Sequence, residues 1–249
     1  MVACFRKKVL PLTRASAVWT LTGLAMLWVA QPAQADDWGL SLALSTDYVV
    51  RGLTRSMGQG SQSLDLAWRR DTGWGVDLGV VALHRDAEGR VLQTSARLGR
   101  TWQWDQDWSG ELGYAHAAYP GSEQRSNFNY DELAGHLIWQ GRWVLSGSWF
   151  PKISRRDAQN NLISAPAFSA SLGLRQNLPL SLALDAGLGL YAHRTAEPRS
   201  YVFGSIDLSW SQGPWQCHLS HIASNAEAQG LAQAGRAGRR WLATLQLGF

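Results

Sequence analysis

After its first 35 residues the sequence lacks any apolar run long enough to form a membrane-spanning helix. Such a helix needs about 20 successive apolar residues, and here every run is broken within a few residues by Ser, Gly, Asp or Arg. Cysteine is scarce too: Cys4 lies near the start, and Cys217 alone remains in the rest of the chain. A helical membrane bundle and an internal disulfide framework are therefore both excluded.

The first 35 residues themselves have the pattern of a secretory signal peptide. Four basic residues between positions 6 and 14 precede an uncharged stretch, and Ala33-Gln34-Ala35 stands directly before Asp36. A basic segment, an apolar segment shorter than a spanning helix and an A-x-A site together mark a cleavable export signal. We expect cleavage between Ala35 and Asp36, which leaves residues 36–249 as one mature domain.

An excess of charge of either sign is also absent from the expected mature chain. The full sequence has 23 basic and 19 acidic residues, and residues 1–35 contain four basic residues and no acidic one, so 19 of each remain. A formal charge of zero gives no reason to expect a nucleic-acid partner or polybasic attachment to a membrane surface.

What the sequence has instead is an apolar–polar alternation with a period of two. In the first predicted strand, one face carries Leu40, Leu42, Leu44, Thr46, Tyr48 and Val50. Further strands are predicted near residues 61–69, 74–83, 91–102, 108–118, 128–139, 142–150, 167–175, 180–191, 201–210, 215–223 and 240–249. Most have the roughly 9 to 11 residues that a tilted strand needs to cross a bilayer.

The connections and the tryptophans both distinguish one end of these strands from the other. Short connections alternate with longer ones, of which 151–166 and 224–239 are the longest. The tryptophans beside the short turns or the mature N-terminus are Trp38, Trp68, Trp74, Trp102, Trp104, Trp108, Trp139, Trp143, Trp210 and Trp215. Short periplasmic turns, long outer loops and aromatic girdles are typical of outer-membrane barrels, whereas core aromatics of a soluble β protein would not cluster at one end. The pattern predicts an all-β, transmembrane, antiparallel up-and-down barrel of about 12 strands.

The two faces of each strand indicate that this barrel is inside out. One face carries large Leu, Val and Trp side chains and the other small or charged ones, which suits lipid outside and a wet lumen inside. On this phasing, the charged residues expected to line the pore are Asp47, Arg51, Asp65, Arg69, Asp77, Arg97, Glu111, Glu132, Arg175, Asp185 and Asp207. Mixed charge inside a barrel of this size forms either a salt-bridged plug or the wall of a narrow polar channel. The many lumenal Ser, Ala and Gly residues favour the channel.

Residue types that carry catalysis or bind metal are present but are not arranged for it. His218 and His221 would lie on opposite faces of a strand because they are three residues apart, so no metal site or cofactor is expected. An outer-membrane lipid hydrolase would need His116 or His221 beside a serine, and no G-x-S-x-G motif supports one. We therefore expect a protein that is not an enzyme, with Cys217 as a small apolar residue facing lipid.

The last strand carries the expected signal for assembly. Every second residue back from the carboxy terminus is apolar and faces lipid on the predicted phase. The residues that resemble the segment recognised by barrel-assembly machinery are Trp241, Leu245, Leu247 and the terminal Phe249. The alternate positions of this strand, which include Gln246, are expected to face the lumen.

The segment STDYVVRGLTRS, residues 45–56, resembles the S-x-Y-x-x-R-G-x-S-type opening of the proteobacterial TorF-type porin family. Asp47-Tyr48 and Arg51-Gly52 match that pattern, while Leu53-Thr54 replace the more usual Ile-Ser. Chain length, export signal and terminal aromatic residue agree as well, so the resemblance covers the whole chain and implies an outer-membrane porin with an undefined substrate. We expect Asp47 and Arg51 on one side of the first strand, where they pair in the lumen, gate its outer end or fix the first hairpin.

These features predict a porin-like channel in the bacterial outer membrane that passes small hydrophilic solutes by diffusion. The alternative is a non-conducting barrel that acts through its outer loops in adhesion, reception or envelope structure. The long loops carry more basic than acidic residues, and this surplus either meets lipopolysaccharide phosphates or makes the mouth attract anions. The expected partners are outer-membrane lipid and lipopolysaccharide, the barrel-assembly machinery and small hydrophilic solutes.

Overall fold

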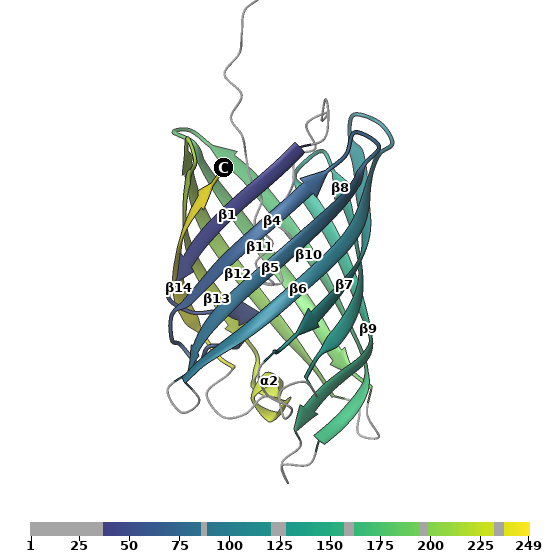
Figure 1. Ribbon diagram of the computed structural model, residues 1–249, viewed down its shortest axis with the longest axis vertical. Helices are drawn as coiled ribbons and strands as arrows, with labels where there is room; N and C mark the ends of the chain where they lie inside the picture. The colour runs from purple at the N-terminus through teal and green to yellow at the C-terminus, as the bar shows by residue number, and fades with distance from the viewer. Residues whose placement is uncertain (1–36, 86–88, 121–127, 157–161, 195–198, 232–236) are drawn as a thin grey trace, which may run out of the picture.

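Twelve antiparallel strands close into one barrel (Figure 1). This computed structural model describes residues 37–249 apart from 86–88, 121–127, 157–161, 195–198 and 232–236, so the predicted signal peptide and its cleavage site between Ala35 and Asp36 lie outside the described residues. The barrel strands are β1 (Asp37–Ser45), β4 (Ser61–Arg69), β5 (Trp74–Arg85), β6 (Gly89–Gln103), β7 (Trp108–Ala118), β8 (Tyr130–Trp139), β9 (Trp143–Arg156), β10 (Leu162–Leu178), β11 (Leu182–His193), β12 (Arg199–Gln212), β13 (Trp215–Ser224) and β14 (Arg240–Gly248). The predicted fold class and strand number are confirmed.

The barrel closes where the first strand meets the last. β1 pairs with β4 on one side and with β14 on the other, where Leu44 lies opposite Leu245. Phe249 and Leu40 exchange two backbone hydrogen bonds, of 2.8 and 3.1 Å. Because closure leaves no free strand edge in the wall, the backbone polar groups of the strands pair within the sheet.

The barrel turns its apolar face outward, as the alternation predicts. On β11, Leu184 and Leu188 are exposed, whereas the alternate position Ala183 is buried. On β14, Trp241 is 65% exposed and Gln246 only 2%, so the predicted phase of the last strand is confirmed. Large apolar side chains on the outside of a closed sheet suit contact with lipid.

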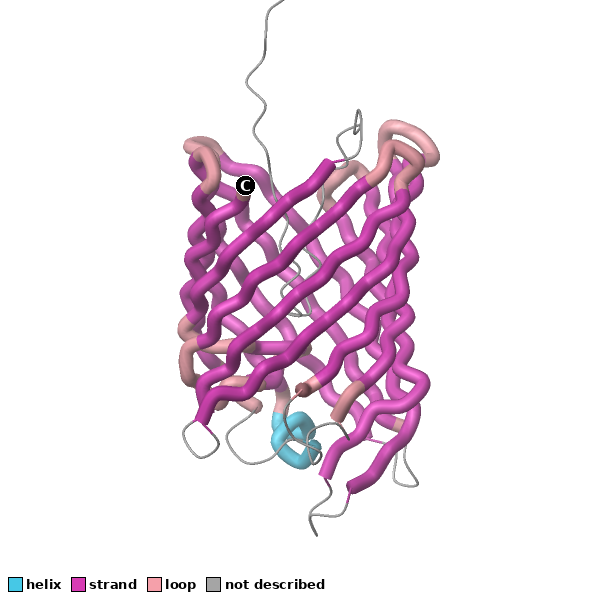
Figure 2. The backbone as a smooth tube through the Cα atoms, in the orientation of Figure 1, coloured by secondary structure: helices cyan, strands magenta, loops and turns pink. Residues whose placement is uncertain are grey.

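The two ends of the barrel differ, as the lengths of the connections predict. Figure 2 shows short turns at the upper end, where the carboxy terminus also lies, and helix α2 (Ala226–Leu231) at the lower end. At the short-turn end, the ring centroids of Trp38 and Trp68 are 6.4 Å apart and those of Trp108 and Trp139 are 6.1 Å apart. This arrangement is typical of an aromatic girdle.

Helices contribute little to the described part of the chain. Helix α2 has six residues. Within the described ranges, no helix is long and apolar enough to cross a membrane.

The longest hairpin of the barrel continues through two prolines that the sequence analysis assigns to a loop. β9 continues to Arg156 and β10 begins at Leu162, so the predicted loop from Pro151 to Pro166 is mostly strand. The register between the two strands shifts at Pro166. A proline has no N–H to donate, and a bulge is one of the few places in a sheet where this costs no ladder hydrogen bond. The prediction of a long loop here is therefore wrong.

The first strand also departs from its prediction. The alternation predicts one strand as far as Val50, but β1 ends at Ser45. Tyr48 and Val50, expected on the lipid face, are 3% and 4% exposed and lie inside the barrel. Residues 46–60 leave the wall and contain a two-stranded sheet of β2 (Val49–Val50) and β3 (Leu53–Thr54). We call residues 46–60 the constriction hairpin.

Candidate functional site

Asp47 turns the chain out of the barrel wall. Its Oδ1 accepts hydrogen bonds from the backbone N–H of Tyr48 at 2.8 Å and from the hydroxyls of Ser56, at 2.7 Å, and Thr54. Its Oδ2 accepts a hydrogen bond from Arg240 of β14 at 2.8 Å. An aspartate that bonds the chain ahead of it stabilises a local turn. The carboxylate thus connects the start of the constriction hairpin to its end, and it also connects the hairpin to β14, where the barrel closes.

Arg51 and Gly52 form the tip of the hairpin. They connect β2 to β3 as a two-residue turn, with φ angles of 50° at Arg51 and 77° at Gly52. Two successive positive φ angles characterise the type I′ turn of tight hairpins, which favours glycine. A Cβ atom at position 52 would lie 2.5 Å from the Cβ of Phe203. The tip therefore fits closely against β12.

The tip is fixed to the wall on the far side of the lumen from β1. Arg51 Nη2 forms an ion pair with Glu132 Oε1 of β8 at 2.6 Å, and Arg51 Nε donates to Ser169 Oγ of β10 at 3.2 Å. The guanidinium lies 4.5 Å from the ring centroid of Phe150 on β9. The Tyr201 hydroxyl donates to the Arg51 carbonyl at 2.9 Å. Because β9 and its neighbours lie farthest from β1 in the strand order, the hairpin crosses the lumen.

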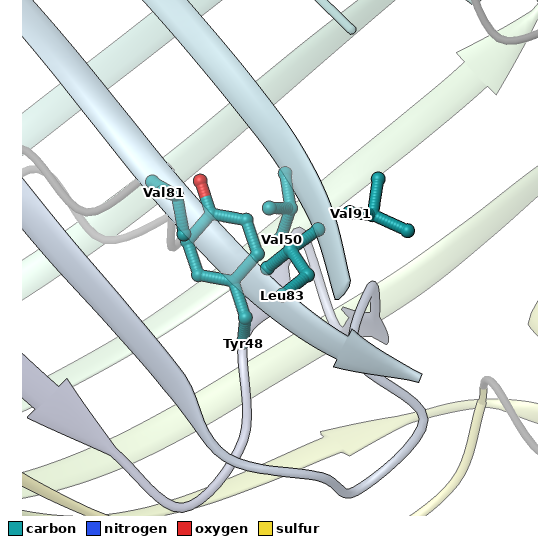
Figure 3. Packing of buried hydrophobic residues seen from close by; sticks show 5 residues of the cluster. All are labelled: Tyr48, Val50, Val81, Leu83 and Val91. Atoms are coloured by element: carbon teal, nitrogen blue, oxygen red, sulfur yellow. The ribbon is translucent and has the colours of Figure 1, made fainter. Parts of the chain in front are cut away.

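Apolar contacts pack the constriction hairpin against the wall on two sides. Figure 3 shows one cluster, between the hairpin and strands β5 and β6, which consists of Tyr48, Val50, Val81, Leu83 and Val91. A second cluster places Val49 against Ile222 of β13 and Leu242 of β14. Successive residues of β2 thus contact the wall on either side of β1. Packed side chains narrow the lumen at this level.

Asp47 and Arg51 lie in the lumen, but not as neighbours on one side of the first strand. That placement is wrong because the strand ends before both residues. Asp47 pairs with Arg240, and Arg51 pairs with Glu132. Of the three roles that the sequence leaves open for them, these contacts favour fixing the hairpin.

The other charged residues expected in the lumen lie on the barrel wall, and most of them pair between neighbouring strands. The pairs are Arg69–Asp77 at 2.6 Å, Arg97–Glu111, Arg175–Asp185 at 3.8 Å and His218–Asp207 at 3.1 Å. Asp65 differs, since its Oδ2 is buried without a hydrogen-bond partner among the described residues. The lumen therefore combines a salt-bridged wall with a hairpin that crosses it.

The sequence-based prediction omits Arg240, Arg55 and an arc of aromatic rings. The arc consists of Tyr130, Phe150, Tyr191, Tyr201 and Phe203, and the centroids of adjacent rings lie between 5.3 and 6.2 Å apart. Tyr130 shares the strand face of Glu132, and Tyr201 shares that of Asp207. The alternation that places Glu132 and Asp207 in the lumen continues to the outer ends of these strands. It could therefore have identified these rings as lumenal from the sequence.

The two histidines that the sequence analysis considers for lipid hydrolysis, His116 and His221, contact other groups, and the His–Ser hydrogen bond that the structure has joins His136 Nδ1 and Ser146 Oγ at 2.9 Å. In the ranges that the structure describes, no three His, Cys, Asp or Glu side chains come together as metal ligands. His116 Nδ1 forms a hydrogen bond with Asp131 Oδ1 at 2.8 Å, and the ring of His221 packs at a tilt against that of Trp241 with 4.7 Å between centroids, so neither is paired with a serine among the described residues. His218 and His221 lie on opposite faces of β13, as their spacing predicts.

Comparison with known structures relates this fold to small outer-membrane porins. The NanC porin is similar with a TM-score of 0.56 over 85% of this chain and 98% of its own, at 8% sequence identity. The KdgM porin is similar with a TM-score of 0.53 over 85% of this chain and 99% of its own, at 11% identity. No protein-family model and no curated protein matches the sequence. The similarity shows a porin-like barrel of 12 strands, and membership of the TorF-type family is not confirmed.

Proposed function

We propose that this protein is a porin-type channel of the bacterial outer membrane, through which small hydrophilic solutes diffuse. The observation that carries the proposal is a closed barrel with an apolar outside, a polar lumen and one hairpin fixed across it. A barrel of about eight strands is filled by its own side chains, and one of about 16 to 18 strands leaves an open aqueous channel. Twelve strands leave room for a passage beside the constriction hairpin, which sets the size of the solutes that pass.

The lining beside the hairpin supports this proposal. A pocket lies between the hairpin tip and the wall from β9 to β13, and its lining combines Arg51, Ser146, Ser171 and Ser205 with apolar side chains such as those of Val49, Val144 and Ile222. Hydroxyl groups and small side chains suit the passage of hydrated solutes. Three of the similar solved structures are porins by name, and one of these is the KdgM porin in complex with disordered oligogalacturonate. The resemblance of residues 45–56 to TorF-type porins agrees with a channel.

Recordings from purified protein in planar lipid bilayers test the proposal. We expect discrete conductance steps in KCl, and we expect liposomes that contain the protein to swell in small sugars but not in large ones. Folding is checked on the same sample by the change in gel mobility between unheated and heated protein. Persistent electrical silence of folded protein would overturn the proposal and favour a non-conducting barrel that acts through its outer loops.

A further inference from the structure

Arg100 is a basic side chain on the outside of the barrel wall. It lies two positions after Leu98 on the same face of β6, and it lies opposite Trp74 of β5 and Leu112 of β7. These three neighbours are exposed on the outer surface. Arg97, three positions earlier, takes the other face of the strand and pairs with a carboxylate in the lumen. Arg100 therefore points toward lipid.

The position of Arg100 is close to the short-turn end of the barrel. Trp74 is the first residue of β5, and β6 ends at Gln103, three positions after Arg100. Figure 1 shows β5, β6 and β7 side by side with this end uppermost. With a rise of about 3.3 Å per residue and a tilt of about 45°, three residues span only about 7 Å along the membrane normal. Arg100 thus lies near the interface, where a charge on the lipid-facing side costs least.

Two tryptophan rings hold the guanidinium of Arg100 at this level. Its Cζ lies 5.6 Å from the ring centroid of Trp74 and 5.4 Å from that of Trp102. Both distances are short enough for attraction between a cation and the face of an aromatic ring. Its Nε is buried without a hydrogen-bond partner, and no hydrogen bond or ion pair holds the guanidinium among the described residues. The rings therefore fix a positive charge on the lipid-facing surface and leave it without an anion.

The surroundings of Arg100 match the structure of a glycerophospholipid. The phosphate of such a lipid lies at the level of the aromatic girdle, and a guanidinium binds phosphate oxygens through two parallel hydrogen bonds. Toward the middle of the barrel, the exposed side chain of Leu98 offers an apolar surface to the acyl chains. If the short turns face the periplasm, as they do in outer-membrane barrels, this end of the wall lies in the leaflet that consists of glycerophospholipids.

We propose that Arg100, Trp74 and Trp102 form a binding site for the phosphate of a glycerophospholipid in the periplasmic leaflet. The guanidinium pairs with the phosphate, the two indole rings hold the guanidinium in place, and the acyl chains pack over Leu98 and Leu112. One guanidinium matches the single negative charge of a phosphodiester. The inference requires that the barrel lies in a membrane, and it does not depend on whether the lumen conducts.

Native mass spectrometry of the folded protein in detergent tests the site. Phosphatidylglycerol is titrated, and the fraction of protein that carries one lipid gives the Kd. Diacylglycerol with the same acyl chains but no phosphate should bind wild-type protein far more weakly. Arg100→Gln should raise the Kd for phosphatidylglycerol about tenfold, because it removes hydrogen bonds between charged groups. Trp102→Leu keeps the charge but removes one of the rings that hold it, so it should raise the Kd by a smaller factor.

Arg142→Gln is the matched control. Arg142 is exposed at another short turn of the same end, and its Nη2 donates to Gln176 Oε1 at 2.5 Å. The substitution removes the same charge from the same end of the barrel and should leave the Kd as it is in the wild type. Folding of each variant is checked by the change in gel mobility between unheated and heated protein.

Several results would overturn the proposal. Equal Kd values for the wild type and Arg100→Gln, or an equal loss of affinity in Arg142→Gln, would overturn the site while the channel stands. Displacement of the lipid by an equal concentration of inorganic phosphate would show a site for free anions instead of a lipid site. A Kd for Trp102→Leu equal to that of the wild type would overturn the role of the rings. A silent wild-type bilayer overturns the channel, and mass spectrometry then still decides the lipid site.

Discussion

Two sets of ion pairs face the lumen, one within the barrel wall and one between the wall and the constriction hairpin. In the wall, Arg97 and Glu111 pair across the neighbouring strands β6 and β7 and are 14 positions apart in the sequence. At the hairpin tip, Arg51 and Glu132 pair across the lumen and are 81 positions apart. The first pair joins segments that a single turn already brings together, and the second joins segments that only the closed barrel brings together.

The difference lies in what else holds each pair in place. β6 and β7 are joined by a ladder of ten facing residue pairs, so their side-chain ion pair adds to an attachment that exists without it. The hairpin has only two facing residue pairs of its own and is attached to the wall by side chains. Segments with few backbone bonds to the rest of a protein open at the lowest free energy. We therefore expect changes in the hairpin contacts to open the lumen and changes in the wall pairs to leave it as it is.

The largest effect is expected for Gly52→Val at the hairpin tip. A side chain at position 52 meets Phe203, and the backbone of the valine would also have to adopt a φ of 77°. The tip can then no longer lie against β12. We expect the hairpin to leave its position and the single-channel conductance to rise several-fold in planar bilayers.

Gly58→Val separates the clash at the tip from backbone strain. Gly58 lies in the same hairpin with a similar φ of 80°, but no atom stands within 4 Å of the position of its Cβ. This variant should raise the conductance much less than Gly52→Val. Equal effects of the two substitutions would show that contact with Phe203 does not hold the tip.

A smaller effect is expected when the long-range ion pair is removed. Arg51→Gln and Glu132→Gln should each weaken docking of the hairpin by about 1.5–3 kcal/mol, because each removes a hydrogen bond between charged groups. The two substitutions together should cost no more than about the larger of the two, since they remove one shared interaction. The measurement is the rate at which trypsin cleaves the folded protein after Arg55. Cleavage as slow as in the wild type would contradict an anchoring role for the pair.

The smallest effect is expected for the wall pair. The double variant Arg97→Gln/Glu111→Gln replaces both partners with neutral groups of similar shape, and such a replacement is close to neutral when both partners change. Its conductance should stay near that of the wild type, as should the temperature at which its gel mobility changes. A rise in conductance as large as that of Arg51→Gln/Glu132→Gln would remove the distinction between wall and hairpin.

The wall could be predicted from the sequence because each strand marks its own faces. Asp185 and Asp207 are placed in the lumen by the apolar residues that flank them, and they lie opposite each other on β11 and β12. The same reasoning fails at Tyr48, which continues the alternation of β1 but lies inside the barrel. An apolar–polar alternation with a period of two shows on which face of a strand each residue lies. It contains no information on where the chain leaves the sheet.

The sequence by itself determined the barrel, its strand number and the phase of its last strand, because alternation, turn length and tryptophan position are local properties of the chain. Only the tertiary structure decided the path of residues 46–60. The partners that hold this segment are Glu132 and Arg240, and the latter is 193 positions from Asp47. A local pattern does not reveal which distant side chains the closed barrel brings near. For the same reason, only the tertiary structure shows Arg55 inside the lumen without a partner among the described residues.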